Sequence, residues 1–166
     1  MLSTSKAERD AEFVAFVQVG APSLGRTAYL LTGDRELAAD LVQEALLKTY
    51  LAWRRVRRAE ALPFARRTLV NLNIDRWRRR PAIPSETVDS VSESGEKQVD
   101  DADQIVRALA TLPAQQRRVI VLRFLDDLPE AAVAEHLGIS VGTVKSACSR
   151  GLATLRRTQT TEGILG

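Results

Sequence analysis

The chain has 166 residues, a mass of 18.3 kDa and a net charge of +3, which allows one ordinary domain or two small ones. Apolar residues make up 45% of it and aromatic residues only 5%, so wholesale disorder is excluded and helices are expected to dominate. A lone cysteine and a lone histidine exclude an internal disulfide and the usual metal or triad sites, and no apolar run approaches the roughly 18 residues of a membrane span.

Apolar residues at helical spacing predict the following helices before residue 81: Asp10–Val19, Leu24–Leu31, Glu36 to about Val56, and about Pro63 to Arg80. Gly20 and Pro22 are expected to break the chain between the first two. Asp34 is a candidate N-cap of the third helix, because its carboxylate can accept the free amides of the next turn. Pro63 suits the first turn of the fourth.

Charge is distributed unevenly along the chain. Residues 54–80 contain ten arginines and two acids, a local charge of +8, and such a surface favours phosphate and base-edge contacts. Residues 81–104 contain seven acids, one base, two prolines and four serines, and cannot bury enough apolar surface to offset their ordering entropy. We therefore predict an all-α protein with a helical domain at 1–80, a flexible acidic linker at 81–104 and a second helical domain at 105–166.

The second domain shows a helix-turn-helix pattern. The expected helices are Ile105–Leu112, Gln115–Leu125, Glu130–Leu137 and Val141 to about Arg157. Gly138, Ile139 and Ser140 form the short turn before the last helix, with Ser140 as its cap. The side chains available for burial are Val119, Leu122, Phe124, Val144, Leu152 and Leu155. The opposite face of the last helix offers short polar donors and two cations, as a major-groove helix requires, and the alternative is a helical hairpin whose polar face is only solvated.

Two further stretches are ambiguous. The arginine-rich helix, with Asn71, Asn73 and Trp77, can grip a nucleic-acid strand, or it can pack against acidic partners or face water. Trp53 and Trp77 are each expected in the core rather than as base-stacking platforms. The polar edge of Asp40–Tyr50 is either solvated, which composition favours, or a docking site for a partner protein.

Enzymatic function is not expected. The sequence lacks the GxxxxGK[ST], HExxH and GxSxG motifs. His136 is expected to be structural and Cys148 a small packing residue. The chain is predicted to be a cytoplasmic binding protein without a metal or cofactor.

Three segments together carry a family resemblance. They read LAADLVQEALLKTYLAW, FARRTLVNLNIDRWRRR and LPAQQRRVIVLRFLDDLPEAAVAEHLGISVGTVKSACSRGLATLR. In this order, around an acidic linker, they resemble the extracytoplasmic-function (ECF) class of RNA polymerase sigma factors in the sigma-70 superfamily. The resemblance covers nearly everything from Phe13 to Arg157 and implies a sigma-2 domain before the linker and a sigma-4 domain after it.

The resemblance implies three sets of site residues. Those matching the segment that docks on the polymerase β′ clamp helices are Asp40, Leu41, Gln43, Glu44 and Leu47. Those matching the region that binds and helps open the −10 promoter element are Arg66, Arg67, Asn71, Asp75, Arg76, Arg78 and Arg79. Those matching the −35 recognition helix are Thr143, Lys145, Ser146, Ser149 and Arg150. Two departures from the family pattern are Pro129, where a capping serine or threonine is common, and Ala147–Cys148, where larger polar side chains are common.

The implied partners are core RNA polymerase (β′ clamp helices and β flap), promoter DNA and an anti-sigma factor. The 24 linker residues can span about 80 Å when extended, at roughly 3.3 Å each. Two turns of duplex occupy roughly 70 Å, so the linker can bridge two promoter elements only when drawn out. The competing interpretations are a dimeric operator-binding regulator, for which the sequence offers no spare apolar helix, and a protein-interaction module bound through the arginine helix.

Overall fold

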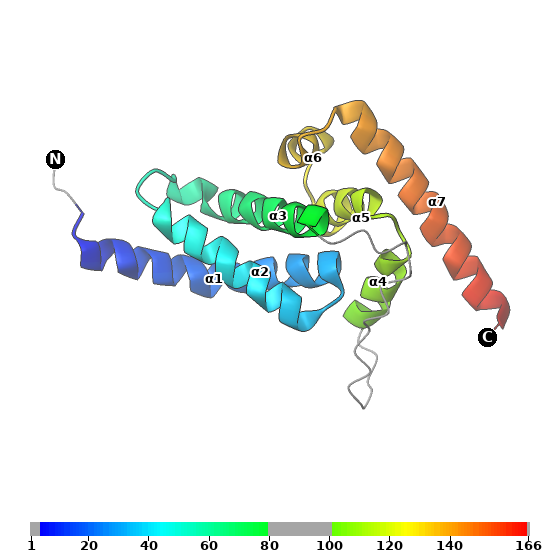
Figure 1. The fold of residues 1–166 in the computed structure, drawn as a ribbon, viewed down its shortest axis with the longest axis horizontal. Helices are drawn as coiled ribbons and strands as arrows, with labels where there is room; N and C mark the ends of the chain where they lie inside the picture. The colour runs from blue at the N-terminus through cyan, green and yellow to red at the C-terminus, as the bar shows by residue number, and fades with distance from the viewer. Residues whose placement is uncertain (1–3, 80–100, 166) are drawn as a thin grey trace.

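The computed structural model describes residues 4–79 and 101–165, and this part of the chain contains helices, turns and irregular segments but no strand. The elements are α1 (Lys6–Thr32), α2 (Arg35–Leu51), the short 3-10 turn η1 (Arg58–Glu60), α3 (Ala61–Arg79), α4 (Asp101–Ala110), α5 (Ala114–Ile120), the π-helical turn η2 (Val121–Leu125), α6 (Glu130–Leu137) and α7 (Val141–Leu165). The predicted all-α class is confirmed. Figure 1 shows α1, α2 and α3 running alongside one another, with α4 to α7 gathered at one end of this group.

The N-terminal domain, α1 to α3, is held by one apolar interior. Leu24, Leu41 and Leu69, one from each helix, are fully buried in it. Asp34 is the N-cap of α2 as predicted, since its Oδ1 accepts a hydrogen bond from the backbone N–H of Leu37 at 3.0 Å. Gly33, with φ of 69°, supplies the left-handed residue that ends α1.

The predicted break at Gly20 and Pro22 is wrong, because α1 is one helix of 27 residues that contains Pro22. Proline removes one backbone hydrogen bond within a helix, which costs stability. That cost is offset by packing on both sides of Pro22, because Gly20 and Leu24 are both buried. The packing at Gly20 is tight, since a Cβ added there would lie only 3.2 Å from the ring of Phe16. Tertiary packing therefore overrides the local signal.

Two other boundaries in this domain differ from the expected ones. The helix α2 ends at Leu51 instead of near Val56, and Trp53 beyond it turns back into the interior. The next helix, α3, begins at Ala61, so Pro63 lies in its first turn as expected.

The helix-turn-helix is confirmed. The helix α6 has the predicted bounds, Gly138 adopts a left-handed φ of 65°, and Ser140 Oγ accepts the Thr143 backbone N–H at 3.1 Å. The following helix, α7, begins at Val141 as expected and extends to Leu165, beyond the expected Arg157. Val144, in the first turn of this helix, is buried on the side that faces the rest of the domain.

Elsewhere in the C-terminal domain, α4 to α7, the expectations need correction. The helix α4 begins at Asp101, inside the predicted linker, and residues 81–100 of that linker lie outside the described residues. The expected Gln115–Leu125 helix is α5 followed by the π-helical turn η2. A π turn takes an extra residue, which changes the face that each following side chain occupies. Leu122 is buried as predicted, but Phe124 is 49% exposed rather than buried.

The two domains contact each other directly. The helix α4 packs on α1, the turn η2 also packs on α1, and α6 packs on α3. Buried apolar side chains of both domains therefore belong to one continuous core.

Candidate functional site

The first turns of α7 present a polar face to solvent. Thr143, Lys145, Ser146, Ser149 and Arg150 are all exposed, whereas Val144 and Ala147 are buried on the side that packs on the domain. The ion pair of Lys145 with Glu130 is long, 3.9 Å from Nζ to Oε2, and both side chains are at least one-third exposed. Such a pair contributes little and leaves the ammonium available to a competing anion. All five predicted −35 residues thus lie together on one accessible helix face.

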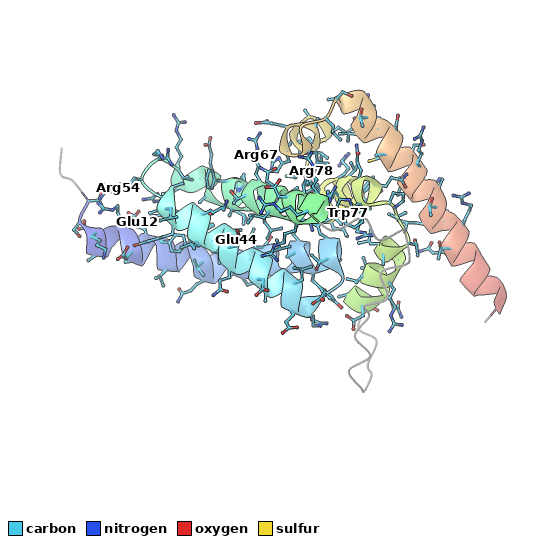
Figure 2. The ribbon with its side chains drawn as sticks, in the orientation of Figure 1. Glu12, Glu44, Arg54, Arg67, Trp77 and Arg78 are labelled. Carbon is cyan, nitrogen blue, oxygen red and sulfur yellow. The ribbon has the colours of Figure 1, made fainter. Side chains whose placement is uncertain are left out.

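The predicted −10 residues of α3 fall into two groups. Asn71, Asp75, Arg78 and Arg79 are exposed, and Arg76 is half-buried, where its Nη2 lies 3.1 Å from Oε2 of Glu44 on α2. Figure 2 shows the side chains of Arg78 and Trp77 at the end of α3 and that of Glu44 below it. The Arg76–Glu44 pair joins one predicted −10 residue to one predicted docking residue.

Arg66, in contrast, is only 8% exposed and faces the C-terminal domain. Its Nε lies 3.4 Å from Oδ2 of Asp126, whose side chain has no exposed surface. The carboxylate of Asp126 also accepts a hydrogen bond from Thr27 Oγ1, at 2.9 and 3.0 Å from its two oxygens. Arg66 Nε makes an ion pair here but no well-aligned hydrogen bond.

The pKa of Asp126 reflects this burial. Removal from water raises the pKa of the carboxyl above its ordinary value, which means that burial outweighs the groups that stabilise its charge. Those groups are the Thr27 hydroxyl and the positive charges of Arg66, Arg26 and His136.

Further polar contacts join α3 to the C-terminal domain. Arg67 donates to the side chain and the backbone carbonyl of Glu135 on α6, at 3.3 and 3.2 Å, and Figure 2 shows Arg67 between these two helices. Asn73 Oδ1 accepts from Arg118 Nε on α5 at 3.1 Å. Burial is the main cause that lowers the pKa of Arg118, and repulsion from Arg117 and Arg78 adds to it.

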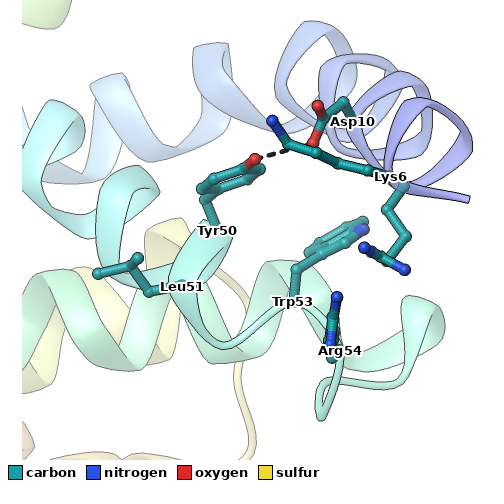
Figure 3. Close-up of a pocket in the computed structure, with 7 residues that line it drawn as sticks. Lys6, Asp10, Tyr50, Leu51, Trp53 and Arg54 are labelled. Carbon is teal, nitrogen blue, oxygen red and sulfur yellow. Dashed lines mark hydrogen bonds between the residues drawn. The ribbon is translucent and has the colours of Figure 1, made fainter.

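The two tryptophans have different environments. Trp53 is buried, as predicted, against Phe13 and Phe16, at ring-centroid distances of 5.1 and 5.4 Å. Trp77 is 47% exposed, so the expectation that it lies in the core is wrong. The edge of the Trp53 cluster opens to a small pocket (Figure 3), lined by Lys6, Arg9, Asp10, Tyr50, Leu51, Trp53 and Arg54.

The predicted docking residues lie on α2. Asp40, Gln43 and Leu47 are exposed, and Leu47, at 57% exposure, forms an apolar stripe with Leu51 one turn later. Leu41 has no exposed surface, so it holds α2 against the core and cannot itself touch a partner in this arrangement.

Arg117 was not anticipated from the sequence. Its guanidinium donates to the carbonyl oxygens of Leu109 and Leu112 at the end of α4, and to that of Leu31 at the end of α1. One side chain thus caps two helices that come from different domains. Arginine in a basic sequence gives no sign of whether it will cap a helix or face a ligand.

The lone histidine and cysteine occupy structural positions. Nδ1 of His136 lies 2.8 Å from the carbonyl oxygen of Ala132 one turn earlier. Cys148 is half-buried, and this burial, with a smaller contribution from the negative charge of Glu130, raises the pKa of its thiol. Among residues 4–79 and 101–165, no three metal-ligating side chains come together. None of the described helices is both long and apolar enough to cross a membrane.

Comparison with known proteins decides the family. Residues 16–82 match Sigma-70 region 2 and residues 102–155 match Sigma-70, region 4. The RNA polymerase sigma-E factor of Streptomyces avermitilis is 37% identical to the chain over 152 residues, covering 87% of this chain and 83% of that protein. The ECF RNA polymerase sigma factor SigL of Mycobacterium tuberculosis is 34% identical over an alignment of 175 positions, gaps included, which covers 95% of this chain and 94% of that protein. The chain belongs to the ECF sigma factors.

A solved structure shares the fold of this sigma factor. The sigma factor RpoE of Bartonella quintana, in complex with the anti-sigma factor NepR, superposes with a TM-score of 0.71 at 22% identity, covering 89% of this chain and 96% of that one. In this sigma factor, the region 2 match contains α2 and α3, and the region 4 match contains α6 and the exposed start of α7. The resemblance inferred from the three sequence motifs is confirmed.

Proposed function

We propose that this sigma factor brings core RNA polymerase to a set of promoters and helps to open them, with α2 as the docking helix, α3 as the −10 surface and α7 as the −35 reader. The observation that carries the proposal is the exposed polar face of α7 in a helix-turn-helix, in a chain that matches both sigma-70 regions. The division into a domain at 1–80, a linker and a second domain is part of the same proposal, with the second domain beginning at Asp101, where α4 starts, instead of at 105.

The proposed mechanism has no catalytic step in the chain itself, so binding energy must supply the work of melting. Arginine contacts to phosphates release counterions and give sequence-independent affinity. Extruding a base from the duplex costs a few kcal/mol of lost stacking. Contacts between the protein and the open strand offset this cost. In this proposal the exposed Arg78 and Arg79 at the end of α3 would make such contacts.

The proposed partners follow from the same surfaces. Leu47 and its polar neighbours Asp40 and Gln43 would contact the β′ clamp helices, and the C-terminal domain would contact the β flap. An anti-sigma factor is a further expected partner. Because polymerase and DNA are its targets, we place this sigma factor in the cytoplasm, without a cofactor.

Polymerase docking is tested by size-exclusion chromatography with purified core enzyme. Leu47→Asp puts a charge into the exposed apolar stripe of α2 and is expected to abolish co-elution. Val19→Asp, at another exposed apolar position on α1, is the matched control and is expected to co-elute like the unaltered chain. Equal co-elution of both variants would contradict the docking role. Palindromic DNA binding by a free dimer would favour the competing regulator.

The DNA surfaces are tested separately. Arg79→Ala is expected to slow open-complex formation and to reduce the slope of log affinity against log salt by about 0.7–0.9, whereas Arg79→Lys keeps the slope. Lys145→Ala is expected to weaken binding to the −35 element while leaving polymerase association intact. If Arg79→Ala leaves the rate of open-complex formation unchanged, α3 does not bind the −10 element. If Lys145→Ala leaves the affinity for the −35 element unchanged, Lys145 does not take part in binding that element.

A further inference from the structure

The pocket beside Trp53 lies between the first turns of α1 and the end of α2, and its volume is about 250 Å³. Figure 3 shows Lys6 and Asp10 of α1 on one side of it and Trp53 and Arg54 on the other. None of its lining residues belongs to the docking set, the −10 set or the −35 set. The pocket is thus separate from the surfaces of the proposed function.

The wall of this pocket is mainly positive. Lys6, Arg9 and Arg54 contribute three positive charges, and Asp10 contributes the single negative charge, so the lining carries a net +2. The side chains of Lys6 and Arg54 make no ion pair or hydrogen bond with the described residues. Arg9 Nη1 donates to the backbone carbonyl oxygen of Thr4 at 2.6 Å, which leaves its charge uncompensated. The three cations are therefore available to an anion.

The acid in the wall already has a partner. Oδ1 of Asp10 accepts a hydrogen bond from Tyr50 Oη at 2.8 Å, as the dashed line in Figure 3 marks. The ring of Tyr50 and the side chain of Leu51, which is 73% exposed, supply the apolar part of the lining. A ligand of this pocket can therefore combine an anionic group with a short apolar body.

Trp53 contributes a buried N–H group that has no acceptor. The residue is 3% exposed, and its Nε1 makes no hydrogen bond within the described part of the chain. Phe13 packs edge-on against its ring and the guanidinium of Arg58 lies over it, so the indole is not free to turn toward another acceptor. A buried donor without a partner is costly. An oxygen atom that entered the pocket would satisfy it once a flexible cationic side chain of the wall moved aside.

A phosphate monoester has the charge and the acceptors that this lining requires. At pH 7 it carries a charge of about −1.5 to −2, close to the opposite of the wall, and it has three strong acceptor oxygens. A carboxylate and a phosphodiester each carry a single negative charge. The chain of a diester also continues on both sides of the phosphate, and this pocket is smaller than the roughly 300–1,000 Å³ of ordinary ligand sites. A terminal phosphate on a small organic group is thus the better fit.

We propose that the pocket binds a small phosphate monoester, with its three cations around the phosphate oxygens and the Trp53 N–H as a donor from the inner wall. The organic part of the ligand contacts Tyr50 and Leu51. Because Leu51 also belongs to the exposed stripe of α2, the bound ligand lies at the edge of that stripe. The site itself depends on none of the roles proposed for α2, α3 and α7.

Binding is tested by isothermal titration calorimetry of the full chain in a buffer free of phosphate, at constant ionic strength. Glycerol 3-phosphate is the monoester probe and is expected to bind saturably. Dimethyl phosphate, a diester with one charge, is expected to bind at least tenfold more weakly.

A pair of neighbouring arginines supplies the matched variants. Arg54→Gln removes one cation from the wall and should weaken binding of glycerol 3-phosphate about tenfold or more, since hydrogen bonds between charged groups are the strong ones. Arg55→Gln removes the same charge from the next residue, which is exposed and does not line the pocket, and should leave the affinity unchanged. Both side chains are exposed, so both variants should fold.

The role of the indole is tested without altering Trp53. The chain has two tryptophans, so Trp77→Phe leaves one indole N–H signal in the ¹H–¹⁵N NMR spectrum. Saturating glycerol 3-phosphate should move this signal downfield as the N–H gains an acceptor.

Each part of the proposal has its own contradicting result. Absence of saturable binding, or equal affinity in Arg54→Gln and Arg55→Gln, would overturn the site. Equal affinity for dimethyl phosphate would overturn the preference for a monoester. An indole signal that stays in place at saturation would overturn the donor role of Trp53. Displacement of glycerol 3-phosphate by an oligonucleotide without terminal phosphates would assign the pocket to DNA instead.

Discussion

Arg58 lies in the basic segment 54–80 but has a structural role. It donates to Glu12 Oε2 at 2.7 Å and to the carbonyl oxygens of Trp53 and Val56 at 2.9 and 3.1 Å, and its guanidinium lies 4.0 Å from the centre of the Trp53 ring. Arg58→Ala removes all of these contacts. For a half-exposed side chain we expect about 0.5–1 kcal/mol from the ring contact, about 0.5 from the ion pair and about 0.5–1 from the carbonyl bonds. The expected loss in the free energy of unfolding is about 2 kcal/mol.

Urea unfolding followed by near-UV circular dichroism measures this loss, which should lower the midpoint by about 1 M. Arg57→Ala is the matched control, because Arg57 is exposed and its side chain makes no ion pair or hydrogen bond with the described residues. We expect Arg57→Ala to leave the midpoint in place and to reduce the salt slope of DNA binding by about 0.7–0.9. Equal destabilisation by both variants, or none by Arg58→Ala, would refute the division into structural and DNA-facing arginines.

Three other predictions concern helix caps, close packing and pH. Ser140→Ala removes the acceptor for the Thr143 amide and should cost about 1 kcal/mol in thermal unfolding, whereas Ser140→Asp should retain the cap. Gly25→Ala meets open space and should stabilise α1 by about 0.5–1 kcal/mol, but Gly151→Ala, whose Cβ would lie 3.1 Å from a side chain of α5, should show no such gain. Because contact between the two domains raises the pKa of Asp126, protonation favours that contact, so the radius of gyration measured by small-angle scattering should fall as pH falls through that pKa and grow as pH rises through it. Asp126→Asn should abolish this dependence.

The sequence predicted the parts of the fold that depend on local chemistry. The Asp34 cap, the bounds of α6, the Gly138 turn and the Ser140 cap each depend on residues within a few positions of one another. The π turn at η2 has no such local sequence signal, and for this reason a regular helical pattern puts Phe124 on the buried face although it is exposed.

Contacts between residues far apart in the chain could not be predicted from the sequence for a different reason. Thr27 and Asp126 are 99 positions apart, and nothing in the pattern around either residue shows that they meet. Arg66 and Arg79 look alike in the sequence, although one is buried against the C-terminal domain and the other is exposed. The family motifs indicate which helix carries the −10 set, and only the three-dimensional arrangement separates its members.

The unbroken course of α1 through Pro22 has a mechanical consequence. At 1.5 Å per residue, its 27 residues form a rod of about 40 Å. The aromatic cluster of Phe13, Phe16 and Trp53 and the pocket beside Tyr50 lie along the first half of α1. The C-terminal domain packs on its last turns, where Thr27 and Tyr29 bond to Asp126 and Asp103. If a bound partner tilted this rod at its first half, the last turns, on which the second domain packs, would move with it.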